Sequence, residues 1–289
     1  YSIMTRRITI SDLADARRQD RKIVAVSCYD YTTARLVAQA GVDIILVGDS
    51  AAQVILGHDS TLPATMDFMV TITAAVRRGA PDVCLVADIP FLSCTTGIYE
   101  AVKNAGRFVR QAGAQLIKIE ASEAQLDVIK AVSDADMAVM AHIGIRPQTL
   151  ARTGRLRAEG TTAQGGLELI LLAEKMVRAG AAALLLEGVA RHVAEIITQR
   201  LDVPVISCGS GPDCDGQVLI ISDILGLNFG PIPKFSKNFG ELGRAITEAV
   251  QAYTTQVRDG VFPDDDHSYH MKAGELEKLQ QMVKALTGD

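Results

Sequence analysis

Tryptophan is absent from this sequence of 289 residues, and aromatic residues make up only 4% of it. Hydrophobic residues still account for 48%, so a large core is available, and it must be built mainly from Ala, Val, Ile and Leu. These residue types fill the strands of parallel sheets, which are buried on both faces. The composition therefore favours an α/β fold.

Regularly spaced cysteines and long apolar runs are also missing. The five cysteines include no CxxC pair, which argues against a disulfide framework and against a zinc cluster. Charged residues or Gly interrupt every apolar run, so we expect no bilayer-spanning segment and no membrane partner. Arg6 and Arg7 precede a mixed polar stretch rather than the apolar run of a signal peptide. We therefore expect a cytoplasmic protein.

No strongly basic stretch is present either, and the formal net charge is -5. The basic clusters are short, and Arg17-Arg18 is separated from Arg21-Lys22 by two residues. A solvated surface explains clusters of this kind. We expect no nucleic-acid partner.

Short β-rich runs alternate with amphipathic segments along the whole chain. Several of the amphipathic segments end in Gly before the next β-rich run, as at Ala112-Gly113-Ala114, which is the usual C-cap of a helix. The predicted strands are residues 23–27, 44–47, 83–87, 116–119, 137–141, 182–186 and 203–207, with an eighth within 218–229. The predicted helices are residues 31–39, 66–78, 98–111, 123–134, 167–178, 189–200 and 242–258.

About eight βα units in roughly 250 residues predict a (β/α)8 barrel, the TIM-barrel fold. An open doubly wound sheet is the alternative, but it usually has a Gly-rich turn after its first strand, and Cys28-Tyr29-Asp30-Tyr31 contains no Gly. We expect residues 1–289 to form a single barrel domain with a short N-terminal extension and a polar helical tail. The tail, residues 259–289, is interpreted either as an oligomer contact or as a frayed end.

Five consecutive predicted strands end at an ionisable residue. Catalytic groups of barrels lie at the C-terminal ends of the strands, and an unpaired buried charge costs several kcal/mol. Core packing therefore does not explain the pattern, and a functional site is expected at that end. The five residues are Asp49, Asp88, Glu120, His142 and Glu187.

Asp49, Asp88 and Glu120 follow three neighbouring strands. Three carboxylates at one rim repel each other unless a positive group lies between them, and oxygen ligands without thiolates suit Mg²⁺. A strand-end Asp can instead cap the following helix. Taken together, the three carboxylates favour a magnesium site.

Lys118, Glu187 and His142 are candidates for the chemistry itself. Lys118 lies two residues before Glu120 and so shares its face of the strand, where it can hold a substrate carboxylate. A structural ion pair and a Schiff base are the alternatives. Glu187 ends an apolar strand, and burial suits it to be a general base, unless it pairs with Arg191. His142 is placed in the site because of its neighbours.

Several motifs resemble the ketopantoate hydroxymethyltransferase family. The most distinctive is the loop Gly57-His58-Asp59-Ser60-Thr61-Leu62-Pro63, and Val47-Gly48-Asp49-Ser50 and Ile117-Lys118-Ile119-Glu120 also match. The resemblance extends in order from about Ser11 to His270 and implies a (β/α)8 barrel. It also implies transfer of a hydroxymethyl group from 5,10-methylenetetrahydrofolate to 3-methyl-2-oxobutanoate, giving 2-dehydropantoate for pantothenate and coenzyme A synthesis.

The resemblance further implies roles for individual residues. Asp49, Asp88 and Glu120 would bind Mg²⁺, and Glu187 would accept the proton. Family members commonly form ring-built homo-oligomers, often decamers, so a homo-oligomer is expected. The resemblance implies that Ser50, Asp88 and Lys118 contact the 2-oxo acid, and we expect Asp49 and His142 to contact it as well.

The sequence departs from the family pattern after Gln148. Residues 153–160 read TGRLRAEG, where family members usually carry a Gly-Gly-aromatic stretch that leads to Val-Gln-Gly. We expect this loop to lie over the barrel mouth, where it bears on how the folate fits. A non-catalytic ligand-binding barrel is therefore one alternative. The other is a magnesium-dependent enolate-forming barrel of the phosphoenolpyruvate mutase and isocitrate lyase group, whose usual KKCGH-like segment is not visible.

Overall fold

Eight parallel strands close into a barrel in the computed structural model, which describes residues 6–230 and 232–287. Each strand pairs with the next along the chain, and the last closes on the first, with Ile23 opposite Gly216. The predicted (β/α)8 fold is confirmed. The strands are β1 (Ile23–Ser27), β2 (Ile44–Val47), β3 (Cys84–Asp88), β4 (Leu116–Glu120), β5 (Ala138–Gly144), β6 (Ala181–Glu187), β7 (Val205–Cys208) and β8 (Gly216–Ile220).

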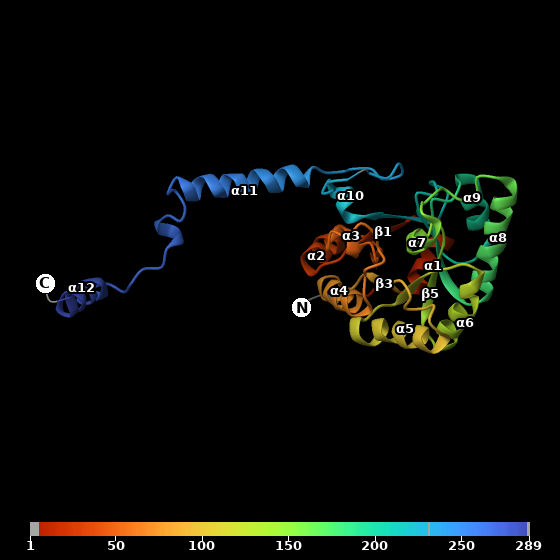
Figure 1. The fold of residues 1–289 in the computed structure, drawn as a ribbon, viewed down its shortest axis with the longest axis horizontal. Coiled ribbons are helices and arrows are strands. Elements are labelled where there is room, and N and C mark those ends of the chain that lie inside the picture. Colours follow the sequence, from red (N-terminus) through yellow and green to blue (C-terminus); the bar gives the residue numbers. More distant parts are fainter. Residues whose placement is uncertain (1–5, 231, 288–289) are drawn as a thin grey trace. The chain divides into compact units, whose positions relative to one another are not determined.

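Helices surround the barrel (Figure 1), and a helix follows each strand except β7, which leads directly to β8 in the described residues. Local capping explains where several begin and end: the Asp30 carboxylate accepts from Thr33 N at 2.9 Å, and Gly113 ends α5 in the left-handed conformation. The helices of the barrel unit are α1 (Ile10–Arg18), α2 (Tyr31–Gln39), α3 (Ala51–Val54), α4 (Met66–Gly79), α5 (Ile98–Ala112), α6 (Leu126–Asp134), α7 (Leu150–Thr153), α8 (Ala163–Arg178), α9 (Arg191–Arg200) and α10 (Ile221–Leu225). Short 3-10 turns at Glu123–Gln125 and Pro147–Thr149 precede α6 and α7.

The eighth strand and the first helix differ from the sequence-based expectation. The strand begins at Gly216, two residues before the expected segment. A Cβ at this position would lie 2.5 Å from Ile23 O, so the close approach of β1 requires glycine. In a sequence, such a glycine is usually taken to weaken a strand, and the strand start was therefore missed. Part of the segment expected to hold the strand forms α10 instead. Within the expected N-terminal extension, α1 begins at a capping box formed by Thr9 and Asp12.

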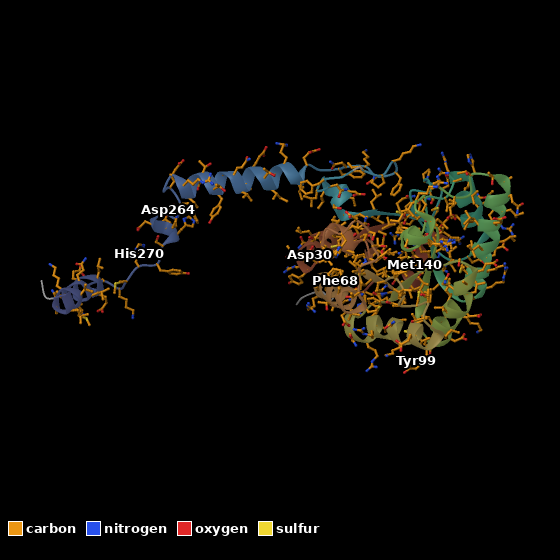
Figure 2. All side chains as sticks on the ribbon, viewed as in Figure 1. Asp30, Phe68, Tyr99, Met140, Asp264 and His270 are labelled. Atoms are coloured by element: carbon orange, nitrogen blue, oxygen red, sulfur yellow. The ribbon has the colours of Figure 1, made fainter. Side chains whose placement is uncertain are left out.

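The half of the barrel interior near the N-terminal ends of the strands, called the lower half below, is apolar, and α1 contributes Leu13 and Ala16 to it. Met140, on β5, lies among the side chains that fill the barrel (Figure 2). Burying one such large aliphatic side chain contributes about 1.5–3 kcal/mol. The strand residues of this interior layer include Ile23, Ile44, Cys84, Leu116, Met140, Leu185 and Ile206.

A second unit, Gly240–Asp289, is compact by its own contacts and separate from the unit Tyr1–Phe239 that holds the barrel. It contains α11 (Leu242–Arg258), a 3-10 turn at Asp265–His267 and α12 (Glu275–Thr287). No residue of α11 is buried among the described residues, although Ile246, Val250 and Tyr253 repeat along it at helical spacing. The helical tail is present, and its role in an oligomer stays a prediction.

No helix in the described part of the chain combines the length and the apolar content needed to cross a membrane.

Candidate active site

The alternation of side chains along each strand explains why charges lie inside the barrel mouth. Successive strand residues point to opposite faces, so residues two apart share a face. Val86 belongs to the interior layer, and Asp88 follows it on the same face of β3. Leu116 is likewise interior, so Lys118 and Glu120 follow it on β4.

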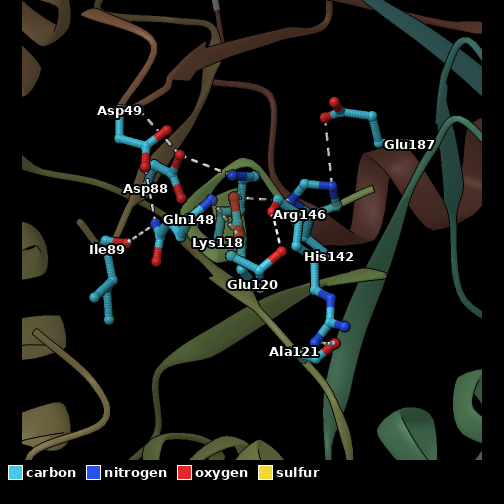
Figure 3. Close-up of polar contacts among 11 residues, drawn as sticks. Asp49, Asp88, Ile89, Lys118, Glu120, Ala121, His142, Arg146, Gln148 and Glu187 are labelled. Atoms are coloured by element: carbon cyan, nitrogen blue, oxygen red, sulfur yellow. Dashed lines mark hydrogen bonds and ion pairs between the residues drawn. The ribbon is translucent and has the colours of Figure 1, made fainter. Parts of the chain in front are cut away.

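The next two strands repeat this arrangement. Met140 lies in the interior layer of β5, and His142 follows two residues later. Leu185 lies in the interior layer of β6, and Glu187 follows it in the same way. The predicted strand-end residues therefore come together at one mouth of the barrel (Figure 3).

Asp88 and Lys118 form a buried ion pair. Lys118 Nζ donates to Asp88 Oδ2 at 2.7 Å, and the backbone N of Asp49 donates to the same oxygen at 3.0 Å. The exposed fractions of the two side chains are only 1% and 6%. The ion pair with a neighbouring aspartate, which the sequence left open, is thus present, while the other Asp88 oxygen, Oδ1, has no hydrogen-bond partner.

Carboxylates outnumber positive groups at this mouth. Burial, followed by the charge of Asp88, raises the pKa of Asp49 to about 7. Burial raises the pKa of Glu120 to about 9, although the charge of Lys118 opposes this. Burial alone would lower the pKa of Lys118, but the charges of Asp88 and Glu120 outweigh it and raise that pKa. A protonated lysine is a poor amine nucleophile, so a Schiff base is disfavoured.

Gln148 is a site residue that the sequence did not reveal. Its side-chain Nε2 donates to Asp49 Oδ2 and to Ile89 O, each at 2.9 Å, and its backbone N donates to Glu120 Oε2 at 3.1 Å (Figure 3). A single residue in the loop after β5 thus connects the ends of β2, β3 and β4. The one available signal was its position in the loop that follows β5, directly after Pro147.

The fit of a magnesium ion is tested by the oxygens that remain unpaired. In residues 6–230 and 232–287, no three His, Cys, Asp or Glu side chains are arranged so that they could hold a metal by themselves. Two buried carboxylate oxygens, Asp88 Oδ1 and Glu120 Oε1, nevertheless have no hydrogen-bond partner. Mg²⁺ usually takes one or two carboxylates together with water and substrate. The donor set fits such an ion, and the assignment of its ligands stays a prediction.

Glu187 and His142 lie close together in the site, where the side chain of His142 is buried and that of Glu187 is 19% exposed. His142 Nε2 lies 3.4 Å from Glu187 Oε2, and His142 Nδ1 lies 3.9 Å from Glu120 Oε1. Burial raises the pKa of Glu187 to about 7, and it lowers the pKa of His142 well below its ordinary value. Arg191, the alternative partner of Glu187, instead forms an ion pair with Asp213 at 2.5 Å.

A cavity of about 270 Å³ opens at this mouth. Asp49, Ser50, Asp88, Lys118 and Glu187 line it, whereas the predicted site residues Glu120 and His142 do not. The remaining lining includes Thr61 of the distinctive loop, Leu150 and Leu156 of the segment that departs from the family pattern, and Phe235.

Tyr29 is a second residue that sequence reasoning missed. Its hydroxyl lies 2.8 Å from Ser50 Oγ, in hydrogen-bond contact. Tyr29 is 3% exposed and lies two residues after the end of β1. The contact ties the side chain of Ser50 to the first strand.

A closed α/β barrel with buried, pKa-shifted groups lining a cavity at its C-terminal mouth is the arrangement of a barrel enzyme. Residues 7–265 match the model of the family described as ketopantoate hydroxymethyltransferase. The chain belongs to this family and is a transferase enzyme.

Two relatives carry the name 3-methyl-2-oxobutanoate hydroxymethyltransferase. The protein of Koribacter versatilis is 44% identical over 278 residues, which cover 96% of this chain and 94% of the relative. The protein of Hyperthermus butylicus is 44% identical over 282 residues, which cover 98% of this chain and 97% of the relative.

Solved structures of other barrels share the fold. A 2,3-dimethylmalate lyase of the PEP mutase/isocitrate lyase superfamily has a TM-score of 0.58 at 19% identity, with 97% of each chain covered. A phosphonopyruvate hydrolase in complex with oxalate and Mg²⁺ has a TM-score of 0.56 at 17% identity, with 96% of this chain and 98% of that chain covered. These similarities show the fold alone.

Proposed function

We propose that this enzyme transfers a hydroxymethyl group from 5,10-methylenetetrahydrofolate to 3-methyl-2-oxobutanoate and so forms 2-dehydropantoate, a step of pantothenate biosynthesis. The names of the relatives support this assignment. The observation that carries it is a half-buried carboxyl group, Glu187, whose pKa of about 7 suits proton removal and which lines the same small cavity as the buried cation Lys118.

Glu187 is the base in this proposal. A general base works best when its pKa lies near the operating pH, and burial brings the pKa of Glu187 to about 7. The carboxylate removes the proton from C3 of the oxo acid, next to the ketone. His142 Nε2, 3.4 Å from Glu187 Oε2, positions the carboxyl group, and burial keeps the imidazole neutral.

Lys118 and Ser50 orient the oxo acid. The Lys118 ammonium, which Asp88 holds at 2.7 Å, attracts the substrate carboxylate, and Tyr29 fixes the Ser50 hydroxyl. Water breaks both bonds between the methylene carbon and the two folate nitrogens, and this releases the carbon as formaldehyde and leaves tetrahydrofolate. The electron pair left at C3 then forms a bond to that carbon, and its oxygen takes the proton held by Glu187 and becomes the product hydroxyl.

Asp49, Asp88 and Glu120 would hold Mg²⁺ in this proposal. When bound, the ion supplies a Lewis acid that stabilises negative charge on the ketone oxygen. The unpaired oxygens Asp88 Oδ1 and Glu120 Oε1 support the assignment, because a buried carboxylate oxygen without a partner is costly.

Deuterium exchange at C3 of 3-methyl-2-oxobutanoate tests the proposal without folate. We expect exchange that depends on Mg²⁺ and Glu187, and 2-dehydropantoate once the donor is added. Failure of exchange together with cleavage of a 2-methylisocitrate-type substrate would instead assign the chain to a lyase activity. Binding of the oxo acid without exchange or cleavage would identify a non-catalytic barrel.

A further inference from the structure

The segment of residues 146–158, between β5 and α8, carries a net positive charge in an otherwise acidic chain. It contains four arginines and no acidic residue, whereas the chain as a whole carries a formal charge of -5. Arg152, Arg155 and Arg157 are exposed. Their guanidinium groups make no ion pair or hydrogen bond with the described residues, unlike Arg191 and Arg200, which pair with acidic side chains.

Backbone and side-chain contacts hold this segment over the barrel mouth. Gln148 fixes its start through Asp49 and Ile89. Beyond its end, Glu159 N donates to Gly188 O at 3.0 Å, and Glu159 O accepts from Ala190 N at 2.9 Å. Leu150 and Leu156 line the cavity between these anchors, and the three exposed arginines lie within two residues of them in the sequence.

The volume of the cavity limits which part of a donor can enter it. About 270 Å³ lies below the range of roughly 300–1,000 Å³ that is typical for drug-sized ligands. In the proposed function the oxo acid would fill part of this space. A tetrahydrofolate donor has a bicyclic pterin, an aminobenzoyl group and a glutamate, so its glutamate end must extend outward over the rim.

We propose that Arg152, Arg155 and Arg157 bind the glutamate carboxylates of the folate donor and favour donors that carry several γ-linked glutamates. This inference rests on the proposed function and names the donor class that the same site prefers. Each added glutamate brings one more negative charge, and guanidinium groups bind carboxylates through paired hydrogen bonds. The three arginines have no competing acidic partner in the segment.

Isothermal titration of the full chain with tetrahydrofolate carrying one or five glutamates tests this inference, with Mg²⁺ and the oxo acid present. We expect the dissociation constant of the pentaglutamate to be about tenfold lower at low ionic strength and nearly equal to that of the monoglutamate at about 0.5 M salt, because salt screens exposed charges. The variant R155Q/R157Q should lose most of this preference.

The matched control is R78Q/R110Q. Arg78 and Arg110 are also exposed, but they lie in the last turns of α4 and α5, which lead into the opposite end of the barrel. This variant should keep the preference. Equal affinity for the two donors in the wild type, a preference that survives in R155Q/R157Q, or an equal loss in the control would each overturn the inference.

Deuterium exchange separates this inference from the proposed function, because exchange needs no donor. Exchange should proceed at the wild-type rate in R155Q/R157Q. If the wild type exchanges deuterium but does not distinguish the donors, the inference alone fails. If the wild type exchanges none, the proposed function fails and the inference fails with it.

Discussion

The same strands carry apolar side chains in the lower half of the barrel interior and ionisable side chains in the upper half, at the C-terminal mouth. In the lower half, the inward positions are apolar and fully buried, as at Leu116 and Leu185. Two residues further along, the same faces of β4 and β6 carry Lys118 and Glu187. Burial thus stabilises the fold at one end, and at the other it shifts pKa values.

This difference shows that the residues that stabilise the barrel and the residues suited to chemistry lie in different halves of its interior. An apolar side chain gains from leaving water, whereas a buried charge gains only when it is paired. Asp49 and Glu120, whose pKa values are raised to about 7 and about 9, lack enough positive neighbours for full ionisation. The upper half is therefore less stable than its packing alone would allow, in a way that a bound cation would relieve.

Replacing Glu187 by Gln should have the largest effect on chemistry. We expect the exchange rate at C3 to fall by about 10²–10⁴-fold, the usual contribution of a general base. Binding of Mg²⁺ and oxo acid should persist, because Gln keeps the shape of the side chain. Exchange measured by NMR and binding measured by calorimetry check the two expectations, and undiminished exchange would remove Glu187 from the role of base.

Asp88→Ala should affect both binding and stability. We expect Mg²⁺ binding to be lost and the free energy of unfolding to fall by about 3–5 kcal/mol, because Lys118 would keep a buried, unpaired charge. The double variant D88A/K118M should recover most of the stability and none of the binding. Denaturant unfolding and calorimetry measure these effects, and a double variant no more stable than D88A would contradict the ion-pair explanation.

Leu116→Ala tests the lower half on the same strand. We expect the free energy of unfolding to fall by about 2–5 kcal/mol, because the substitution leaves a cavity in the closed interior. Affinity for Mg²⁺ and the rate of exchange at a temperature where the variant is folded should remain near the wild-type values. A large loss of metal affinity would show that the two halves are coupled rather than independent.

The effect of pH on stability should also distinguish the halves. Burial raises the pKa of Glu187 from 4.5 to about 7, so the folded state holds this proton more tightly than the unfolded state. The free energy of unfolding should therefore fall as the pH rises from about 4.5 to about 7, by about 1–3 kcal/mol from this group. Unfolding curves at pH 5 and pH 8 should show this loss reduced in E187Q and retained in L116A.

Much of the fold and part of the site follow from patterns that are local in sequence. The bounds of β1, β2, α2 and α11 agree with the prediction, and caps such as Asp30 explain why. The strand-end charges were readable because a period of two places Asp88 and Glu187 on inward faces. Gln148 and Tyr29 were not readable, since their partners lie on other strands and their contacts depend on loop conformation.

Replacing Gln148, which orients a proposed metal ligand, should have the smallest effect of these variants. In Q148A, Asp49 loses the hydrogen bond at 2.9 Å that orients its carboxylate, while the backbone contact to Glu120 remains. We expect Mg²⁺ affinity in the presence of the oxo acid to fall about tenfold, as for other residues that orient ligands. The KM for the oxo acid should rise more than kcat falls. Q199A, which removes an exposed amide of α9, should leave both unchanged. A fall in kcat alone would indicate instead that Gln148 acts on the reacting atoms.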